Sequence, residues 1–103
     1  MALMQITIIP LGTGTPSVGD YVADVVQVLE DKEIPYVLND MGTVIEGEVN
    51  ELLGLASMLH ELPFISGVER VITQIVLDDR RDVQRTLGDK PLAVRRRLEE
   101  RSK

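Results

Sequence analysis

The densest group of polar side chains in this sequence lies in residues 39–48, NDMGTVIEGE. We expect this segment to hold a strand end, a turn, a second strand and the start of a helix. Its glycines would allow a ligand to come close to the backbone. Its polar residues are Asn39, Asp40, Thr43, Glu46 and Glu48, and its glycines are Gly42 and Gly47. Such a group could bind an amino-bearing or cationic small molecule.

Glu46 lies within an apolar stretch, where a carboxylate without a partner is costly. Three partners are open at this point: a ligand, the glycine-rich loop at residues 12–20, or a neighbouring subunit. Thr43 and Glu46 fall on opposite sides of an ideal strand. One pocket can therefore hold both only if the strand bends or a neighbouring subunit contributes.

The loop at residues 12–20, GTGTPSVGD, is the expected second wall of such a pocket, because the strand before it should lie beside the strand at 43–46. Ser17 could offer a hydroxyl, or it could cap the following helix. Tyr21 could offer a hydroxyl and a flat ring, or it could simply pack in the core or at an interface.

The usual catalytic and metal-binding patterns are mostly missing from the sequence. It has no cysteine, which excludes disulfides, thiolate metal sites and a cysteine nucleophile. The single histidine, His60, has no obvious metal partner, so we expect it on a helix surface or at an interface. Asp78, Asp79 and Asp82 could suggest a carboxylate metal site, but two arginines at 80–81 favour local salt bridges instead. There is no phosphate-binding loop, and the glycines at 12, 14 and 19 do not have the dinucleotide-binding spacing.

The charge is distributed unevenly along the chain. The net charge is −6, but residues 1–78 hold 12 acids and two bases, whereas residues 79–103 hold five acids and nine bases. The acidic body should repel nucleic acid and favour cationic or amine-bearing ligands. We expect the basic tail to form a solvated or subunit-contacting helix; an RNA-binding arm is the alternative, although no aromatic stacking residue accompanies it.

The hydropathy pattern predicts the elements that must position these groups. Strands are expected at 3–11, 36–39, 43–46 and 68–77. Helices are expected from about residue 18 or 19 to 33, from Glu48 to a stop at Pro63, and from about Pro91 onward. This order, β-α-β-β-α-β with a final helix, predicts one α+β domain over residues 1–103. Its four-stranded antiparallel sheet would carry both helices on one face.

The second face of that sheet is too apolar to be left in water. In the first strand Gln5, Thr7 and Ile9 should point to it, and the last strand is rich in aliphatic residues on both sides. We therefore expect another copy of the chain to pack there, in a closed symmetric oligomer, with Gln5, Thr7 and Gln74 as polar members. No apolar run is long enough to span a bilayer, and no secretion signal is recognisable, so we expect a cytoplasmic protein.

Three segments of the chain carry a family resemblance: IIPLGTGTPSVGDYVADVVQVLE, IPYVLNDMGTVIEGE and RVITQIVLDDRRD. In this order they resemble the small single-repeat branch of the YkoF-like thiamine-binding superfamily, over nearly the whole chain. The MGTVIEGE element is the most specific part. The resemblance implies a ferredoxin-like sandwich that assembles as a homodimer through its sheets and usually as a homotetramer. It also implies binding of thiamine or its hydroxymethylpyrimidine part, without an established catalytic activity.

Together these considerations predict a non-catalytic binding protein, with no metal or cofactor and no nucleic-acid or membrane partner. The expected ligand contacts come from the loop and helix after the first strand and from the 39–46 segment. They are Ser17, Tyr21, Asn39, Met41, Thr43 and Glu46, with Thr43 and Glu46 as the main polar contacts. The alternative is a structural or regulatory homo-oligomer that binds no thiamine. A weaker option is an enzyme acting on a pyrimidine or a phosphorylated precursor by carboxylate acid–base chemistry.

Overall fold

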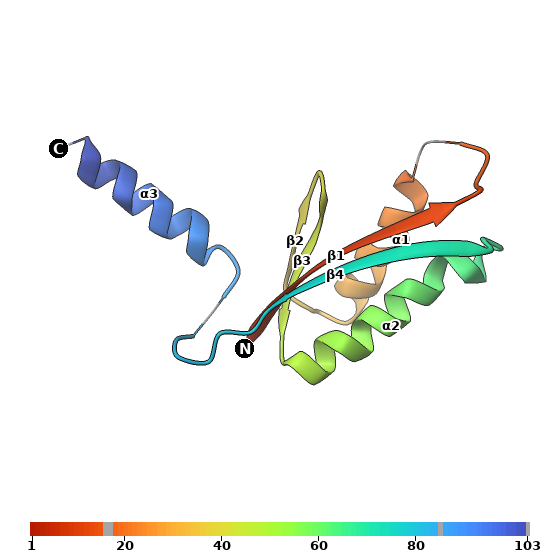
Figure 1. Ribbon diagram of the computed structural model, residues 1–103, viewed down its shortest axis with the longest axis horizontal. Coiled ribbons are helices and arrows are strands. Elements are labelled where there is room, and N and C mark those ends of the chain that lie inside the picture. Colours follow the sequence, from red (N-terminus) through yellow and green to blue (C-terminus); the bar gives the residue numbers. More distant parts are fainter. Residues whose placement is uncertain (16–17, 85, 103) are drawn as a thin grey trace.

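A computed structural model describes residues 1–15, 18–84 and 86–102. The strands are β1 (Ala2–Leu11), β2 (Tyr36–Asn39), β3 (Gly42–Gly47) and β4 (Arg70–Asp78), and the helices are α1 (Gly19–Asp31), α2 (Val49–Ile65) and α3 (Asp89–Arg101). The sheet has the order β2-β3-β1-β4, and every neighbouring pair is antiparallel. This is the predicted α+β arrangement, with α3 added after the ferredoxin-like unit (Figure 1).

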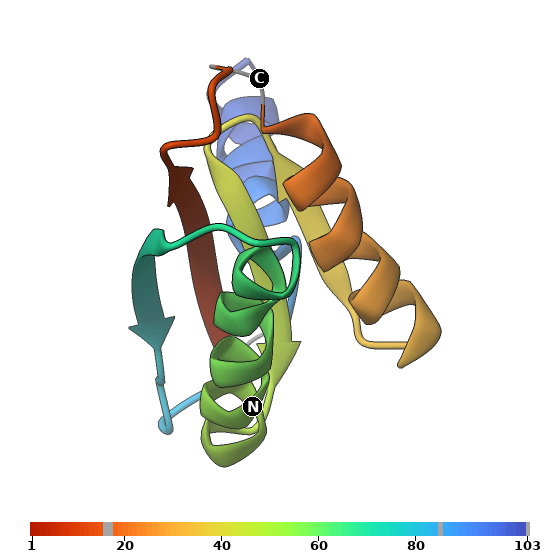
Figure 2. The same ribbon diagram turned by 90° about the vertical axis from the view of Figure 1, so that its right-hand side faces the viewer.

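Both α1 and α2 cover the same face of the sheet, as the sequence predicted (Figure 2). Residues of β1 and β3 that alternate along the strands meet the apolar stripes of the two helices in a single core. This core contains Ala2, Met4, Ile6, Val25, Leu29, Ile45, Leu52, Leu55, Ala56 and Leu59. Helices α1 and α2 therefore cover one face of the sheet, and neither of them covers the other face.

The side without helices, which we call the open face, carries the alternate residues of the four strands. By register these are Leu3, Gln5, Thr7, Ile9, Leu11, Val37, Asn39, Gly42, Val44, Glu46, Arg70, Ile72, Gln74, Val76 and Asp78. The aliphatic side chains at its edges are well exposed: Val37 at 43%, Ile72 at 42% and Val76 at 63%. This face is mixed in composition, and every strand contributes at least one aliphatic side chain to it.

The prediction that α2 stops at Pro63 is wrong, because Pro63 is buried inside the helix and α2 continues to Ile65. The helix ends two residues later at a glycine. Gly67 has φ +94°, its N–H donates to the Phe64 carbonyl, and the next N–H donates from Val68 to the Pro63 carbonyl. This hydrogen-bond pattern closes a helix through a left-handed residue. A proline in the last turn costs one hydrogen bond, but its fixed φ is still helical.

A side-chain hydrogen bond joins α1 to β2 beside the core. Tyr36 Oη donates to Glu30 Oε1 over 2.5 Å, and this bond, with the nearby negative charge, raises the pKa of Tyr36. The folded pKa then lies above the unfolded value of about 10. The contribution to stability is fully present below that value and is lost as the pH rises through the folded pKa.

We accordingly expect Tyr36 to ionise at higher pH in the native protein than in the unfolded chain. An absorbance titration of the phenolate, comparing the wild type with Tyr36→Phe, checks this. The free energy of unfolding of the wild type should fall at alkaline pH. In Tyr36→Phe this fall should be smaller, because the contribution from ionisation of Tyr36 is absent. Identical alkaline stability profiles for the two proteins would contradict the assignment.

Candidate functional site

A hollow of about 440 Å³ lies on the helix side of the sheet, between α1 and the β2–β3 hairpin; we call it the α1 hollow. Three segments far apart in the sequence meet there. Its lining residues are Ile6, Thr7, Ile8 and Ile9 from β1, Val18, Tyr21, Val22 and Val25 from α1 and the residue before it, and Leu38, Asn39, Asp40, Met41, Gly42 and Thr43 from the hairpin. Its size and its mostly apolar lining with a few polar groups are typical of small-molecule sites.

Thr43 is the most deeply buried polar residue among the described residues of this lining. Thr43 is 5% exposed, because β3 directs it toward the helices between two pairing strands. Within the described part of the chain, no side-chain hydrogen bond is made by its hydroxyl. A buried hydroxyl without a partner costs free energy, which a ligand could recover by bonding to it.

Two residues allow the hairpin that carries Thr43 to lie close to β1: Thr7, through a hydrogen bond, and Gly42, through its lack of a side chain. Thr7 Oγ1 donates to the Met41 carbonyl over 3.0 Å. A Cβ on Gly42 would lie 2.8 Å from that same Thr7 oxygen and 3.2 Å from the Ile6 carbonyl. Gly42 is therefore needed for close packing of the hairpin against β1, whereas we expected it to let a ligand come close to the backbone. Met41 at the hairpin tip stays 82% exposed while it borders the hollow.

Among the residues that the structure describes, the lining of the α1 hollow contains one charged residue, Asp40, and one residue with an amide side chain, Asn39. Asn39 stands at the end of the hairpin, so it borders both the α1 hollow and a second hollow on the open face. A carboxylate and an amide at the mouth of an apolar cavity can bind a cation and exchange hydrogen bonds with an amino group. Asp40 and Thr7 were not among the expected ligand contacts. Thr7 belongs to the open face by register, and, like Asn39, it also borders the α1 hollow.

The structure brings together four of the six expected site residues: Tyr21, Asn39, Met41 and Thr43. Ser17 lies outside the described residues. Glu46 lies on the opposite side of β3, as the strand alternation predicted, and it does not border the α1 hollow. A contact between Glu46 and a ligand in this hollow therefore stays a prediction that would need a neighbouring copy.

Glu46 does have a partner in its own chain. Its Oε1 accepts a hydrogen bond of 3.2 Å from the backbone N–H of Leu87, 41 residues further on. The expectation that this half-buried carboxylate needs a partner is confirmed. The partner is the segment before α3 and not the glycine-rich loop.

The loop at 12–20 contributes less to the hollow than expected. Val18, at its end, borders the α1 hollow, whereas Gly12 and Thr13 border a separate depression beside residues 66–70. The first turns of α1 supply most of that wall instead. The apolar stripe of Val18, Val22 and Val25 was visible in the sequence, but only the packing of α1 showed that part of it lines a cavity.

The aspartates at 78–82 and His60, which we considered as alternative sites, make contacts within the chain. Arg80 pairs with Asp82 at 2.7 Å, and Arg81 pairs with Asp79 at 2.9 Å, as the alternation of signs predicted. His60 Nδ1 and Thr73 Oγ1 are 2.6 Å apart, which links α2 to β4. The described residues contain no group of three or more histidine or acidic side chains arranged to hold a metal ion. In the same part of the chain, no helix has the length and hydropathy needed to cross a membrane.

Comparisons with known proteins agree with this architecture. UPF0045 protein YqgV of Bacillus subtilis is 47% identical, over 96% of this chain and 99% of its own. The crystal structure of MJ1052 from Methanocaldococcus jannaschii superposes with a TM-score of 0.79 at 32% identity, over 90% of this chain and 94% of the other. The Thermotoga maritima protein TM0486, described as a candidate for thiamine biosynthesis or salvage, shares the fold at 15% identity, with a TM-score of 0.74 over 90% of this chain and 97% of its own.

A family profile described as "Thiamine-binding protein" matches residues 4–95, which include all of the β-α-β-β-α-β unit except the first two residues of β1, and both walls of the α1 hollow. The residues that carried the resemblance in the sequence lie inside this match. The chain belongs to the thiamine-binding protein family.

Proposed function

We propose that this protein binds thiamine or its hydroxymethylpyrimidine part in the α1 hollow, without catalysing a reaction. The observation that carries the proposal is the buried Thr43 hydroxyl, which lines a cavity of about 440 Å³ and has no side-chain partner in the described chain. Membership of the thiamine-binding family supports the choice of ligand.

The chemistry of the lining suits the two halves of thiamine differently. The aminopyrimidine needs hydrogen-bond donors and acceptors beside an apolar surface, which Thr43, Asn39 and the valines of α1 could supply. The cationic thiazolium needs negative charge, which Asp40 at the mouth and the acidic body could supply. Tyr21 borders the same hollow and offers a ring for stacking.

We also propose that the protein works as a homo-oligomer, a dimer through the open faces and further a tetramer. The exposed aliphatic side chains of that face support this, because a small domain has little net stability with which to keep such a surface in water. A two-fold axis would place identical faces, each with exposed aliphatic side chains, against each other, as in sheet-on-sheet packing.

Isothermal titration with thiamine, hydroxymethylpyrimidine and the thiamine phosphates tests the binding proposal. Thr43→Val keeps the shape of the side chain and removes the hydroxyl. We expect it to weaken binding at least tenfold, because a hydrogen bond in a buried site is lost. Its free energy of unfolding should stay unchanged or rise slightly, because the apo hydroxyl has no side-chain partner to lose.

Thr73→Val is the control, because it makes the same change on β4, which is separated from β3 by β1 and lies outside the hollow. It should bind thiamine like the wild type. Loss of heat in Glu46→Gln with an intact oligomer would indicate a ligand contact from a neighbouring copy. If Glu46→Gln keeps the heat of thiamine binding, Glu46 serves only as the hydrogen-bond partner of Leu87. An intact oligomer that gives no heat with any ligand would overturn the binding proposal in favour of a structural or regulatory oligomer.

A further inference from the structure

The C-terminal helix α3 is fully formed but packs against little of its own chain. It has 13 residues, none of them buried, and in Figure 1 it stands apart from the body. Its aliphatic side chains Leu92, Val94 and Leu98 are 46%, 52% and 55% exposed. An isolated helix of this length is marginal in water. A surface outside this chain is therefore needed to hold it.

The start of α3 is fixed over the open face. Leu87 is bonded to Glu46, and Asp89 accepts hydrogen bonds from the backbone N–H and the hydroxyl of Thr86 at 2.9 and 2.7 Å. The segment from Thr86 to Pro91 and the open-face residues Leu3, Val44 and Val76 border a hollow of about 500 Å³. Figure 2 shows α3 on the side of the sheet opposite α1 and α2. The helix thus leaves the body from the face where a second copy would pack.

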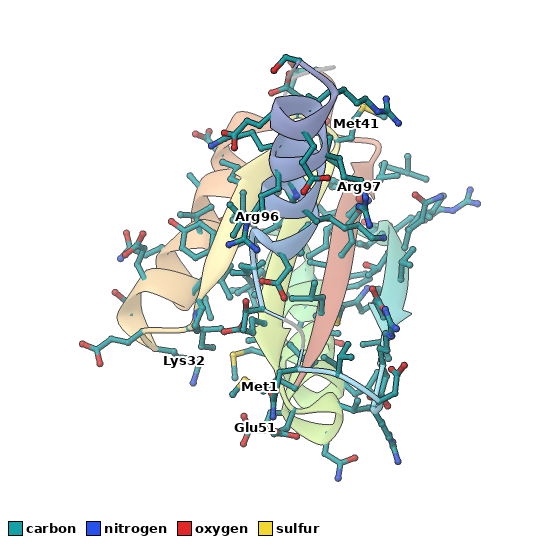
Figure 3. The ribbon with its side chains drawn as sticks, turned by 90° about the vertical axis from the view of Figure 1, so that its left-hand side faces the viewer. Met1, Lys32, Met41, Glu51, Arg96 and Arg97 are labelled. Carbon is teal, nitrogen blue, oxygen red and sulfur yellow. The ribbon has the colours of Figure 1, made fainter. Side chains whose placement is uncertain are left out.

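The charge of α3 is opposite to that of the body. Arg95, Arg96, Arg97 and Arg101 form no ion pair with an acid in the described part of this chain. Arg96 and Arg97 extend to either side of the helix (Figure 3). Residues 1–78, in contrast, carry 12 acids and two bases. A second copy of this chain therefore offers both an apolar face beside the start of α3 and acidic groups for its arginines.

We propose that α3 is an arm that docks on a second copy of this chain, so that two copies exchange their C-terminal helices. A helix of 13 residues is about 20 Å long at 1.5 Å per residue. Two sheets packed face to face lie about 10 Å apart. An arm that starts on the open face is therefore long enough to extend beyond the plane of the partner's sheet, toward acidic groups of its residues 1–78. This inference rests on the pairing of open faces in the proposed function.

Sedimentation velocity of the full-length protein at several salt concentrations tests the arm. We compare Arg96→Gln/Arg97→Gln with Arg80→Gln/Arg81→Gln. Both variants lose two guanidinium groups, but Arg80 and Arg81 pair with acids of their own chain. We expect the arm variant to raise the dissociation constant of the oligomer at least tenfold, and the matched control to change it less than threefold. Added salt should weaken the wild type more than the arm variant.

Amide hydrogen exchange of residues 89–101 measures directly whether α3 is docked. These amides should be protected when the wild type is assembled, and they should exchange fast on dilution and in the arm variant. Fast exchange in the assembled wild type, or equal dissociation constants for the two variants, would overturn the arm. If the α3 amides become protected only after single-stranded RNA is added, docking on a second copy is also overturned, in favour of a nucleic-acid partner.

Two further measurements separate this inference from the proposed function. Val76→Lys disturbs the open face without removing any arginine of α3. If it dissociates the oligomer while the arm variant does not, the faces pair and the arm proposal fails. A wild type that is monomeric with a fast-exchanging α3 overturns both the pairing and the arm. The heat of thiamine binding, measured on the same sample, then reports on the ligand site alone.

Discussion

Leu29→Ala is expected to lower the free energy of unfolding by about 2–5 kcal/mol, the range for truncating a fully buried leucine. Leu29 is 0% exposed, and only it and Val25 are buried on α1. Truncation leaves a cavity beneath the helix whose N-terminal half walls the α1 hollow. We therefore also expect weaker thiamine binding, because α1 would be held less firmly against the sheet.

Urea unfolding followed by circular dichroism measures this loss, and Leu53→Ala is its control. Leu53 lies on α2 and is 46% exposed, so the same truncation there removes little buried area. Its cost should be well below that of Leu29→Ala. Equal losses for the two variants would contradict the assignment of Leu29 to the core.

Gly42→Ala is expected to destabilise the protein by about 1–3 kcal/mol, as for overpacking at a tight contact. The new Cβ would lie 2.8 Å from Thr7 Oγ1 and 3.2 Å from the Ile6 carbonyl. Because the second neighbour is backbone, the strands themselves must move apart. The same movement would widen the α1 hollow, which both Gly42 and Thr7 border, so thiamine affinity should fall as well.

A double-mutant cycle with Thr7→Ala resolves the cause of this loss. Thr7→Ala alone removes the hydrogen bond to Met41, but it also removes the oxygen nearest the new Cβ. The double variant should therefore lose less stability than the sum of the two single variants. Gly54→Ala is the control, because Gly54 is in α2 and nothing lies within 4 Å of its Cβ position. It should stabilise the helix by about 0.5–1 kcal/mol. Additive losses would rule out the contact with Thr7 as the cause.

Local periodicity was enough to predict most of the fold. Alternation in β1 separated Met4 and Ile6 from Gln5 and Thr7, and the structure buries the first pair in the core. A proline predicts the end of a helix, but Pro63 lies in the last turn of α2, where its fixed φ is still helical. The residue that ends the helix is Gly67, whose left-handed conformation closes the last turn.

The candidate site was predictable only in part, because it depends on contacts between distant segments. The strand alternation correctly separated Thr43 from Glu46. The order of the elements led us to expect Tyr21 and Thr43 at one pocket, but which part of α1 forms its wall depends on how α1 packs against the hairpin. The strand alternation could not identify Leu87 as the partner of Glu46, since no local pattern links residues 41 positions apart.

The sequence by itself determined the order of the elements, the side of the sheet on which each strand residue lies, and the opposite charges of body and tail, because these follow from spacing and composition. The tertiary structure decided which side chains share the α1 hollow, where Glu46 finds its partner, and that α3 leaves the body from the open face. These features depend on strand pairing and on the packing of helices on the sheet, which join residues that no short window of sequence contains together.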